Sequence, residues 1–252
     1  PRAASKLGSK PQFFKWDPQS GPAPKEAFKG VDAVINLMGE NISEGRWNDD
    51  QKKRIRNSRI IGTENLVKTL NESEVKTFIS TSAIGVYGDR PASEEVTEDA
   101  EVKPVDFLSE VCQDWEAEAR KANDSIRKCI LRVGVVLEKD GGAIAKMLTP
   151  FKLGVGGVIG SGDQVMSWIH RDDLVNLYVT CLDNTEYTGI VNATAPRPVT
   201  NRVFTHTMGK VIKRPTIFPV PTFAAKLAFG DMSVILLEGQ KVIPSKAVSY
   251  TH

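Results

Sequence analysis

The sequence predicts an α/β fold in which helices pack on a parallel sheet. Three observations lead to this prediction: near-continuous apolar runs, helical patterns between them, and small or glycine residues where the runs end. Strands that are buried on both faces of a parallel sheet read as continuous apolar runs, and strands alternating with helices form βαβ units. The 252 residues allow one large domain or a domain with a smaller lobe.

The first half of the chain predicts three strands and a long helix. Residues 12–16 predict a short strand, and residues 31–38 predict a strand in the centre of the sheet because the run is almost entirely apolar. Asn48 supplies an N-cap, and two aspartates follow it in the first turn of a helix that runs to about Leu70. The next strand contains the apolar pair at 78–79.

The second half continues the alternation and becomes richer in glycine. In order, we expect a helix at 107–121, a strand at 127–137, a helix at 143–153, a helix at 174–182 capped by Asp172 or Asp173, a strand at 189–194, and a helix from Thr200 to about Lys213. The glycine-dense segment 154–162 lacks the Lys-Ser/Thr pair of a phosphate loop, and no strong strand precedes it. We interpret it as a flexible wall of a substrate cleft.

Composition argues against several classes of function. The net charge is only +2, which provides no broad basic surface for nucleic acid. Three widely spaced cysteines and three histidines without ligand spacing predict neither a disulfide framework nor a metal site. No apolar run approaches the roughly 18 residues of a membrane helix, and no signal peptide is visible. We therefore expect a protein of the reducing cytoplasm that has no membrane partner.

Ser82 is the first candidate for contact with a substrate. It follows the apolar run at 78–79, among small hydroxyl residues, and a glycine comes three residues later. In an open α/β sheet, ligands bind beyond the carboxyl ends of the strands, where such a side chain is delivered. The alternative is that these hydroxyl groups only satisfy a strand-to-loop turn.

Arg59 is a second candidate, because it lies near the apolar stripe of the helix that begins after Asn48. A cation in that position needs an anionic partner, and a phosphate group is one such partner. A salt bridge to a neighbouring carboxylate is the other, and the pattern leaves both open.

Several segments together resemble one family. They are 32–37 (DAVINL), 39–41 (GEN), 58–59 (SR), 80–88 (STSAIGVYG), 141–143 (GGA), 150–151 (PF), 160–162 (GSG), 168–173 (WIHRDD) and 237–244 (LEGQKVIP). The pattern is similar to the extended short-chain dehydrogenase/reductase family, in particular its atypical branch of NAD(P)-dependent sugar-epimerase-like oxidoreductases. The resemblance covers nearly the whole chain.

The resemblance implies a Rossmann-type, doubly wound parallel sheet with a smaller carboxyl-side α/β substrate lobe. Residues 1–140 would form a partial NAD(P)-binding domain, and residues 141–252 would form mainly the substrate lobe with returning sheet elements. The implied cofactor is NADP or NAD, the implied substrate is a small molecule, and a homodimer is one expected assembly.

The resemblance also implies a set of site residues. Ser82 matches the family's substrate-polarising serine. The cofactor would contact Leu37, Met38, Gly39, Arg54, Arg59 and Leu108. The substrate side would be lined by Arg132, Gln164, Trp168 and His170. Alternatively, Leu37 and Met38 are only core residues. Trp168 and His170 could instead anchor the loop before their helix.

Two departures from the family pattern bear on mechanism. No Gly-x-x-Gly-x-x-Gly turn is present, which leaves either a fragment or a fold without its first strand-helix unit. Because the sequence opens without Met and closes without a helix stop, we expect both termini to be cuts through a longer protein. The positions of the family's Tyr-x-x-x-Lys pair hold Leu108 and Cys112, or Phe107 and Val111 in the neighbouring register. Without that pair the standard proton relay is not supported.

Three hypotheses follow. The first is an NAD(P)-dependent oxidoreductase or epimerase-like enzyme with a non-standard proton relay, acting on an unidentified small molecule. The second is a non-catalytic dinucleotide-binding or regulatory protein. The third is a truncated chain with neither property.

Overall fold

A four-stranded parallel sheet forms the centre of the computed structural model, which describes residues 11–139 and 141–250. Its strands lie in the order β1 (Ala33–Asn36), β2 (Thr77–Ala83), β4 (Arg127–Val133) and β8 (Gly189–Ala193). The register places Asn36 beside Ser80, and Ser82 beside Arg132. The predicted parallel α/β sheet is confirmed, and its strands end at a common edge.

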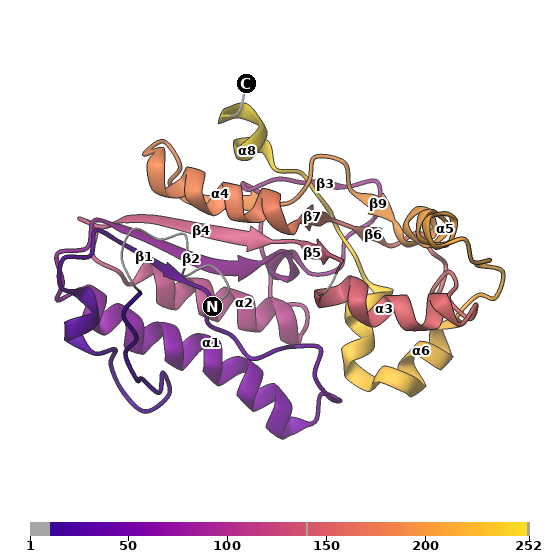
Figure 1. The fold of residues 1–252 in the computed structure, drawn as a ribbon, viewed down its shortest axis with the longest axis horizontal. Coiled ribbons are helices and arrows are strands. Elements are labelled where there is room, and N and C mark those ends of the chain that lie inside the picture. The colour runs from indigo at the N-terminus through magenta and orange to yellow at the C-terminus, as the bar shows by residue number, and fades with distance from the viewer. Residues whose placement is uncertain (1–10, 140, 251–252) are drawn as a thin grey trace.

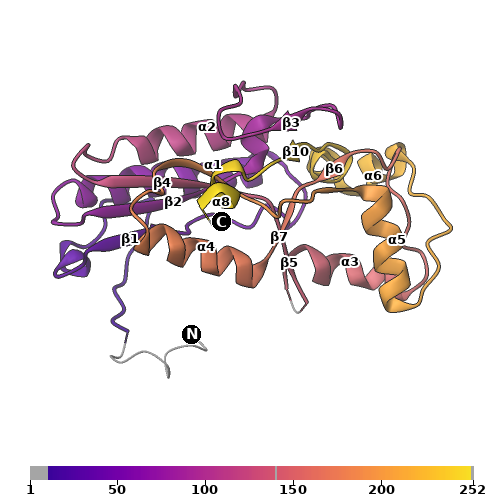
Figure 2. The same cartoon turned by 90° about the horizontal axis from the view of Figure 1, so that it is seen from above.

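Helices cover both faces of this sheet (Figures 1 and 2). Helices α1 (Asp49–Leu70) and α2 (Phe107–Arg120) lie on one face, and α4 (Arg171–Asp183) lies on the other. Within β2, Phe78 belongs to the apolar cluster that includes Leu70, whereas Ile79 belongs to the cluster that includes Cys181 of α4. Burial on both faces explains why this strand reads as an uninterrupted apolar run.

The position of β1 corrects a prediction. We expected residues 31–38 to form a central strand, but in the part of the chain that the structure describes β1 pairs only with β2 and lies at the sheet edge. Ile35 is 39% exposed and Leu37 is 67% exposed. An apolar run of this length occurs in edge strands as well as in central strands, so the sequence pattern does not distinguish the two positions. The strand predicted at 12–16 is also wrong, because those residues have no regular secondary structure.

The run at 127–137 forms two strands rather than one. Gly134 separates β4 from β5 (Val135–Glu138), and β5 pairs with β7 (Trp168–His170) outside the main sheet. A β-carbon at Gly134 would lie 2.6 Å from the backbone oxygen of Ser167. A side chain has no room there, and glycine lets the chain leave the sheet at this point.

The carboxyl-side helices lie beyond the carboxyl ends of the strands (Figure 1). They are α3 (Gly142–Lys152), α5 (Asn201–Ile212), α6 (Thr222–Phe229) and the short α7 (Val234–Leu237). The last helix, α8 (Ser245–Tyr250), returns to pack beside β8. Two short strand pairs accompany them: β3 (Glu95–Val96) with β10 (Lys241–Val242), and β6 (Val165–Met166) with β9 (Val199–Thr200). Four-residue 3-10 helices occur at Lys25–Phe28, Ile84–Tyr87 and Gly230–Ser233.

Helix capping agrees with the sequence at two of three sites. The Asn48 side chain accepts from the Gln51 amide at 2.8 Å, and Thr200 caps α5. At α4 the cap is His170, whose Nδ1 accepts from the Asp172 amide at 3.2 Å, so the prediction of Asp172 or Asp173 is wrong. The helix begins earlier than expected, at Arg171. Both aspartates lie in its first turn, where their negative charges interact favourably with the helix dipole.

Candidate functional site

The segment that follows β1 is positioned by the side chain of Asn36. Its Nδ2 donates to Thr63 Oγ1 at 2.9 Å and to Ser80 Oγ at 3.3 Å, and its Oδ1 accepts from the Met38 amide at 3.1 Å. Asn36 is nearly fully buried, so these bonds replace the water that it gives up. They hold Leu37, Met38 and Gly39 at the carboxyl edge of the sheet.

Arg59 of α1 holds the same segment from the other side. It donates to the backbone oxygens of Ile55 at 3.1 Å and of Glu40 at 3.0 Å, and its guanidinium lies 5.2 Å from the centre of the Trp115 ring. A β-carbon at Gly39 would come within 2.9 Å of Arg59 Nη2, so Gly39 makes this approach possible.

The environment of Arg59 differs from the carboxylate salt bridge considered above. Burial lowers its pKa, although a guanidinium stays charged in proteins. Among the described residues no carboxylate lies within 4.0 Å of it. Two of its five N–H donors serve backbone oxygens, which leaves donors available to an anion.

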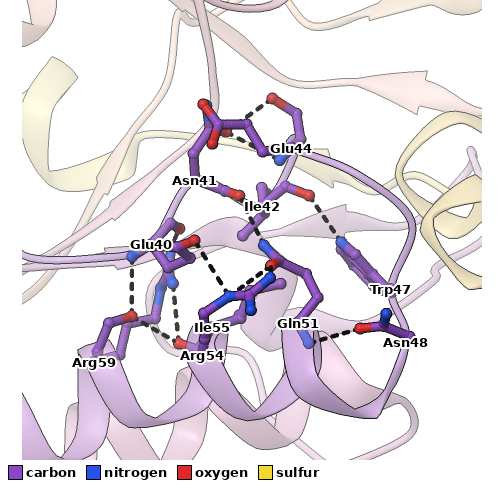
Figure 3. Close-up of polar contacts among 12 residues, drawn as sticks. Glu40, Asn41, Ile42, Glu44, Trp47, Asn48, Gln51, Arg54, Ile55 and Arg59 are labelled. Atoms are coloured by element: carbon purple, nitrogen blue, oxygen red, sulfur yellow. Dashed lines mark hydrogen bonds and ion pairs between the residues drawn. The ribbon is translucent and has the colours of Figure 1, made fainter.

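A hollow of about 470 Å³ adjoins this segment at the amino-terminal end of α1 (Figure 3). It is lined by Glu40, Glu44, Gly45, Arg46, Asn48, Gln51 and Arg54. Arg54 donates from Nε to Gln51 Oε1 at 3.0 Å and lies 3.8 Å from the Glu40 carboxylate. The hollow combines two arginines with the positive end of the α1 dipole.

A smaller hollow of about 300 Å³ lies at the opposite end of the strands, where β4 and β8 begin. Its lining includes Asp124, Arg127 and Gly189, at the amino ends of β4 and β8. Ligands of open α/β sheets bind at the carboxyl ends, so the hollow beside α1 is the candidate for the functional site.

Ser82 belongs to a buried ionic network. Its Oγ donates to Glu116 Oε1 at 2.8 Å, and Arg132 donates to the two oxygens of the same carboxylate at 2.8 and 2.9 Å. Ser82, Glu116 and Arg132 are almost completely buried. Arg120 adds a fourth bond to Glu116 Oε2 at 2.7 Å and reaches solvent with its outer part.

The network determines the charge of each group. Burial raises the pKa of the Glu116 carboxyl, but the hydrogen bonds and charge of Arg132, with the bond from Ser82, outweigh burial and hold the pKa below its usual value. The Glu116 carboxylate in turn raises the pKa of Arg132 against the effect of its burial. Ser82 therefore gives its proton to a bond with a carboxylate that stays ionised at neutral pH.

The positions of the resembled family's Tyr and Lys are occupied by groups without comparable chemistry. Leu108 is apolar and would be 3.6 Å from a β-carbon at Gly85. Burial raises the pKa of the Cys112 thiol to about 12, with the Glu116 charge as the next cause. A neutral thiol cannot supply the positive charge of a lysine, so the departure noted in the sequence persists in the structure.

The residues expected on the substrate side serve four different contacts. Arg132 binds Glu116 and lies 4.7 Å from the centre of the Tyr87 ring. Gln164 donates to the Ile159 and Leu236 oxygens, and Trp168 Nε1 donates to the Arg197 oxygen at 3.2 Å. His170 caps α4. These contacts fit the alternative in which Trp168 and His170 anchor their loop, and a role toward substrate stays a prediction.

Sequence reasoning missed three contributors to this site. Glu116 signals itself as an acidic residue on the apolar side of α2, next to Trp115. Arg46 donates to the Leu227 and Ala228 oxygens at the end of α6, and Lys52 pairs with Asp231 at 2.5 Å. Arg46 lines the hollow, and Lys52 lies in the first turn of α1 beside it. Both contacts reach the carboxyl-side lobe about 180 residues away, beyond the reach of any local pattern.

No group of three or more His, Cys, Asp or Glu side chains within 11–139 and 141–250 is arranged to hold a metal ion. Over the same residues, no helix is both long enough and apolar enough to cross a bilayer.

A parallel sheet with helices on both faces and a site at the carboxyl ends of its strands defines a Rossmann-type fold. Comparison with known families then identifies the class more closely. The NAD dependent epimerase/dehydratase family matches residues 2–193, and a domain of unknown function (DUF1731) matches residues 220–250. The chain belongs to the NAD dependent epimerase/dehydratase family.

Curated relatives carry epimerase-family names. The chloroplastic SDR39U1 homolog of Arabidopsis thaliana is 43% identical over 227 residues, which are 88% of this chain and 65% of the relative. The human epimerase family protein SDR39U1 is 38% identical over 245 residues, which are 95% of this chain and 82% of that protein. The chain thus spans slightly less than two thirds of the Arabidopsis protein.

Solved structures show the same similarity. Human SDR39U1 (isoform 2) with NADPH superimposes with a TM-score of 0.85 at 35% identity, covering 93% of this chain and 79% of that one. A nucleoside-diphosphate sugar epimerase from Corynebacterium glutamicum gives a TM-score of 0.75 at 30% identity, covering 98% and 48% respectively. UDP-glucuronic acid 4-epimerase from Bacillus cereus, with NAD, matches at 18% identity and a TM-score of 0.75, which supports the fold alone.

Proposed function

We propose that this protein is an NAD(P)-dependent oxidoreductase or epimerase-like enzyme that acts on a small molecule. The observation that carries the proposal is the segment after β1, which Asn36 and Arg59 hold at the carboxyl edge of a Rossmann-type sheet. Membership in the epimerase/dehydratase family and similarity to a human relative solved with NADPH support it.

The residues of the site fit a dinucleotide. Arg59 has further N–H donors beside Gly39 that its two backbone hydrogen bonds do not use, and Arg54 lines the adjacent hollow. Both can therefore face an anionic or polar part of a cofactor. Leu37 is largely exposed at the strand end, which suits contact with a flat ring better than a role in the core. We propose Leu37, Met38, Gly39, Arg54, Arg59 and Leu108 as the cofactor contacts within this chain.

When bound, the nicotinamide would supply hydride transfer, which is the chemistry of the cofactor itself. The chain's own contribution is orientation. Ser82, fixed by Glu116, can accept a hydrogen bond from a substrate hydroxyl, but its proton is committed to a carboxylate of low pKa. We therefore propose Ser82 as the group that positions a substrate oxygen and not as a proton donor. Arg132, Gln164, Trp168 and His170 complete the proposed substrate side.

The experiment that tests this proposal is a titration of the full-length protein with NADPH and with NADH, followed by calorimetry. We expect micromolar or tighter binding of at least one of them. Arg59→Met should weaken it by about tenfold or more because a charge-assisted contact is lost. Arg56→Met is the matched control, since Arg56 pairs with Asp114 at an exposed site. The absence of binding by the unaltered protein to both nucleotides would overturn the proposal.

Turnover separates the enzyme from a non-catalytic dinucleotide-binding protein. A panel of carbonyl compounds and nucleotide sugars should include one that changes nicotinamide absorbance, for a net oxidation or reduction, or one that the protein with its cofactor converts to an epimer detected by nuclear magnetic resonance, since epimerisation returns the hydride to the substrate. Tight NADPH binding without turnover over the whole panel would favour a binding or regulatory role.

The cysteines bear on the proposed compartment. Cys112, Cys129 and Cys181 are buried and free, which suits a reducing compartment. We propose the cytoplasm as that compartment and a homodimer as the assembly to test by light scattering.

A further inference from the structure

Helix α6 exposes most of its apolar residues. It buries only Ala225, while Phe223 and Leu227 are 73% and 75% exposed. Thr222 lies near Gly160, where an added β-carbon would be 3.3 Å from Thr222 Oγ1. Thr222 and Ala225 therefore mark the side that packs on the lobe, and helical periodicity places Phe223 and Leu227 on the side that points away from it.

The end of α5 and the connection between α5 and α6 carry further exposed apolar residues. Val211, Ile217 and Phe218 are 73%, 74% and 65% exposed. Both views place α5, α6 and their connection at the end of the molecule beyond the sheet (Figures 1 and 2). We call Val211, Ile217, Phe218, Phe223 and Leu227 the apical surface. Such concentrations of exposed apolar side chains mark interaction sites in soluble domains.

The segment of the chain that carries the apical surface is basic, although Glu238 lies close enough to Lys226 for their charges to interact. Residues 187–230 contain six lysines and arginines and no aspartate or glutamate. The whole chain has a net charge of +2, so this segment carries +6 and the remainder carries −4. Lys210, Lys213 and Lys226 are exposed among the apolar residues. The partner of this surface must therefore tolerate apolar contact and attract cations.

We propose that the apical surface docks the protein on a bilayer that contains anionic lipids. Phenylalanine and aliphatic side chains enter the boundary between headgroups and acyl chains, while nearby lysines pair with anionic headgroups. The surface lies on a short helix and a proline-containing connection at the end of the molecule. Docking of this kind needs no spanning helix, and it departs from the sequence-based expectation of no membrane partner, which rested on the lack of an apolar run long enough for such a helix. The inference is independent of the proposed enzymatic function.

A second copy of the chain fits this surface less well. A two-fold contact joins identical patches, so it would bring the same lysines of both copies together. Repulsion between like charges opposes such a contact. An anionic bilayer instead satisfies the apolar and the basic residues at the same time.

The test is co-sedimentation of the full-length protein with vesicles. Vesicles of phosphatidylcholine alone are compared with vesicles that also contain phosphatidylserine. We expect binding to the anionic vesicles to be about tenfold tighter or more, because several lysines approach the charged surface. Raising the salt from about 0.1 M to about 1 M should release the protein as the Debye length shortens.

Paired variants assign the binding to this surface. Phe223→Ser with Leu227→Ser should weaken binding to anionic vesicles by about tenfold or more. Val175→Ser with Val179→Ser, two exposed valines at the same spacing on α4, is the control and should bind like the unaltered protein. Lys210→Gln with Lys226→Gln should weaken binding, whereas the equally exposed pair Lys15→Gln with Lys29→Gln should not. Thermal unfolding of every variant confirms that it is folded.

Three outcomes would overturn the proposal. One is the absence of binding to either kind of vesicle. Another is equal binding by the Phe223/Leu227 variant and its α4 control. The third is a change in oligomeric state in the Phe223/Leu227 variant without any vesicle binding by the unaltered protein, which would assign the surface to a protein partner.

Discussion

The Ser82 hydroxyl donates a 2.8 Å hydrogen bond to Glu116 Oε1, joining the end of β2 to the middle of α2. Glu116 is at the same time the partner of Arg132 on the neighbouring strand β4. A single carboxylate thus connects two strands of the sheet to the helix that covers them. This arrangement leads to predictions about stability, acid sensitivity and catalysis.

Glu116→Gln should lower the free energy of unfolding by about 3–5 kcal/mol, because it leaves the buried Arg132 guanidinium without its counter-charge. Urea unfolding followed by circular dichroism measures the change. Glu110→Gln, on the same helix but exposed, should stay within about 0.5 kcal/mol of the unaltered protein. Equal effects of the two substitutions would show that the network contributes nothing to stability.

Acid should destabilise the protein partly through Glu116. Its pKa is lower in the folded than in the unfolded chain, so its contribution is present above the unfolded value of about 4.3 and is lost as pH falls through the folded value. Unfolding free energies measured from about pH 6 downward should therefore decline less steeply below about pH 4.3 in Glu116→Gln than in the unaltered protein. Parallel declines would contradict this assignment.

Ser82→Ala should separate binding from turnover. It removes one hydrogen bond to a charged acceptor, at a cost of about 1.5–3 kcal/mol in stability. We expect NADPH affinity to be unchanged and turnover on an identified substrate to fall by about 100-fold, since a group that positions the reacting oxygen is lost. Ser73→Ala, whose hydroxyl bonds Leu70 far from the site, serves as the control. Unaltered turnover in Ser82→Ala would remove Ser82 from the mechanism.

Gly39→Ala should weaken NADPH binding while leaving the fold intact. The added β-carbon would lie 2.9 Å from Arg59 Nη2, and the end of a flexible arginine moves more readily than backbone. We expect an affinity loss of about tenfold by calorimetry and a stability change below about 1 kcal/mol. Gly21→Ala is the control, because no atom lies within 4 Å of its added β-carbon. If Gly39→Ala binds NADPH as tightly as the unaltered protein, Arg59 does not contribute to cofactor binding.

Gly134→Ala should act on the fold instead. Its β-carbon would lie 2.6 Å from the Ser167 backbone oxygen and 2.9 Å from Thr194 Cγ2. Because the backbone at Ser167, between β6 and β7, must move, we expect a loss of about 1–3 kcal/mol in urea unfolding. A neutral effect would mean that the backbone at Ser167 moves away from Gly134 more easily than the packing indicates.

Much of the fold follows from local sequence. The helices at Asp49–Leu70 and Phe107–Arg120, and the strands at Thr77–Ala83 and Gly189–Ala193, form close to where periodicity and caps place them. These features depend on residues a few positions apart, and the Asn48 cap is an example. The bend at Gly134 was not predicted, because its cause is the backbone of Ser167.

The place of the candidate residues in the sheet was predictable, but their partners were not. The strand-end rule directs attention to Ser82 and to the segment after Asn36, and both lie at the carboxyl edge of the sheet. The sequence could not show that Glu116 binds Ser82, or that Arg59 holds a backbone oxygen 19 residues away.

The sequence by itself predicted most of the order of strands and helices and their parallel arrangement, because these depend on periodicity, capping and chain direction. It erred at residues 12–16 and in joining β4 to β5. Only the tertiary structure decided that β1 lies at the sheet edge, that Ser82 is tied to an ionised carboxylate, and that Phe223 and Leu227 remain exposed. These properties depend on contacts between residues far apart in the sequence. The same local pattern is compatible with several different sets of such contacts, so it does not predict them.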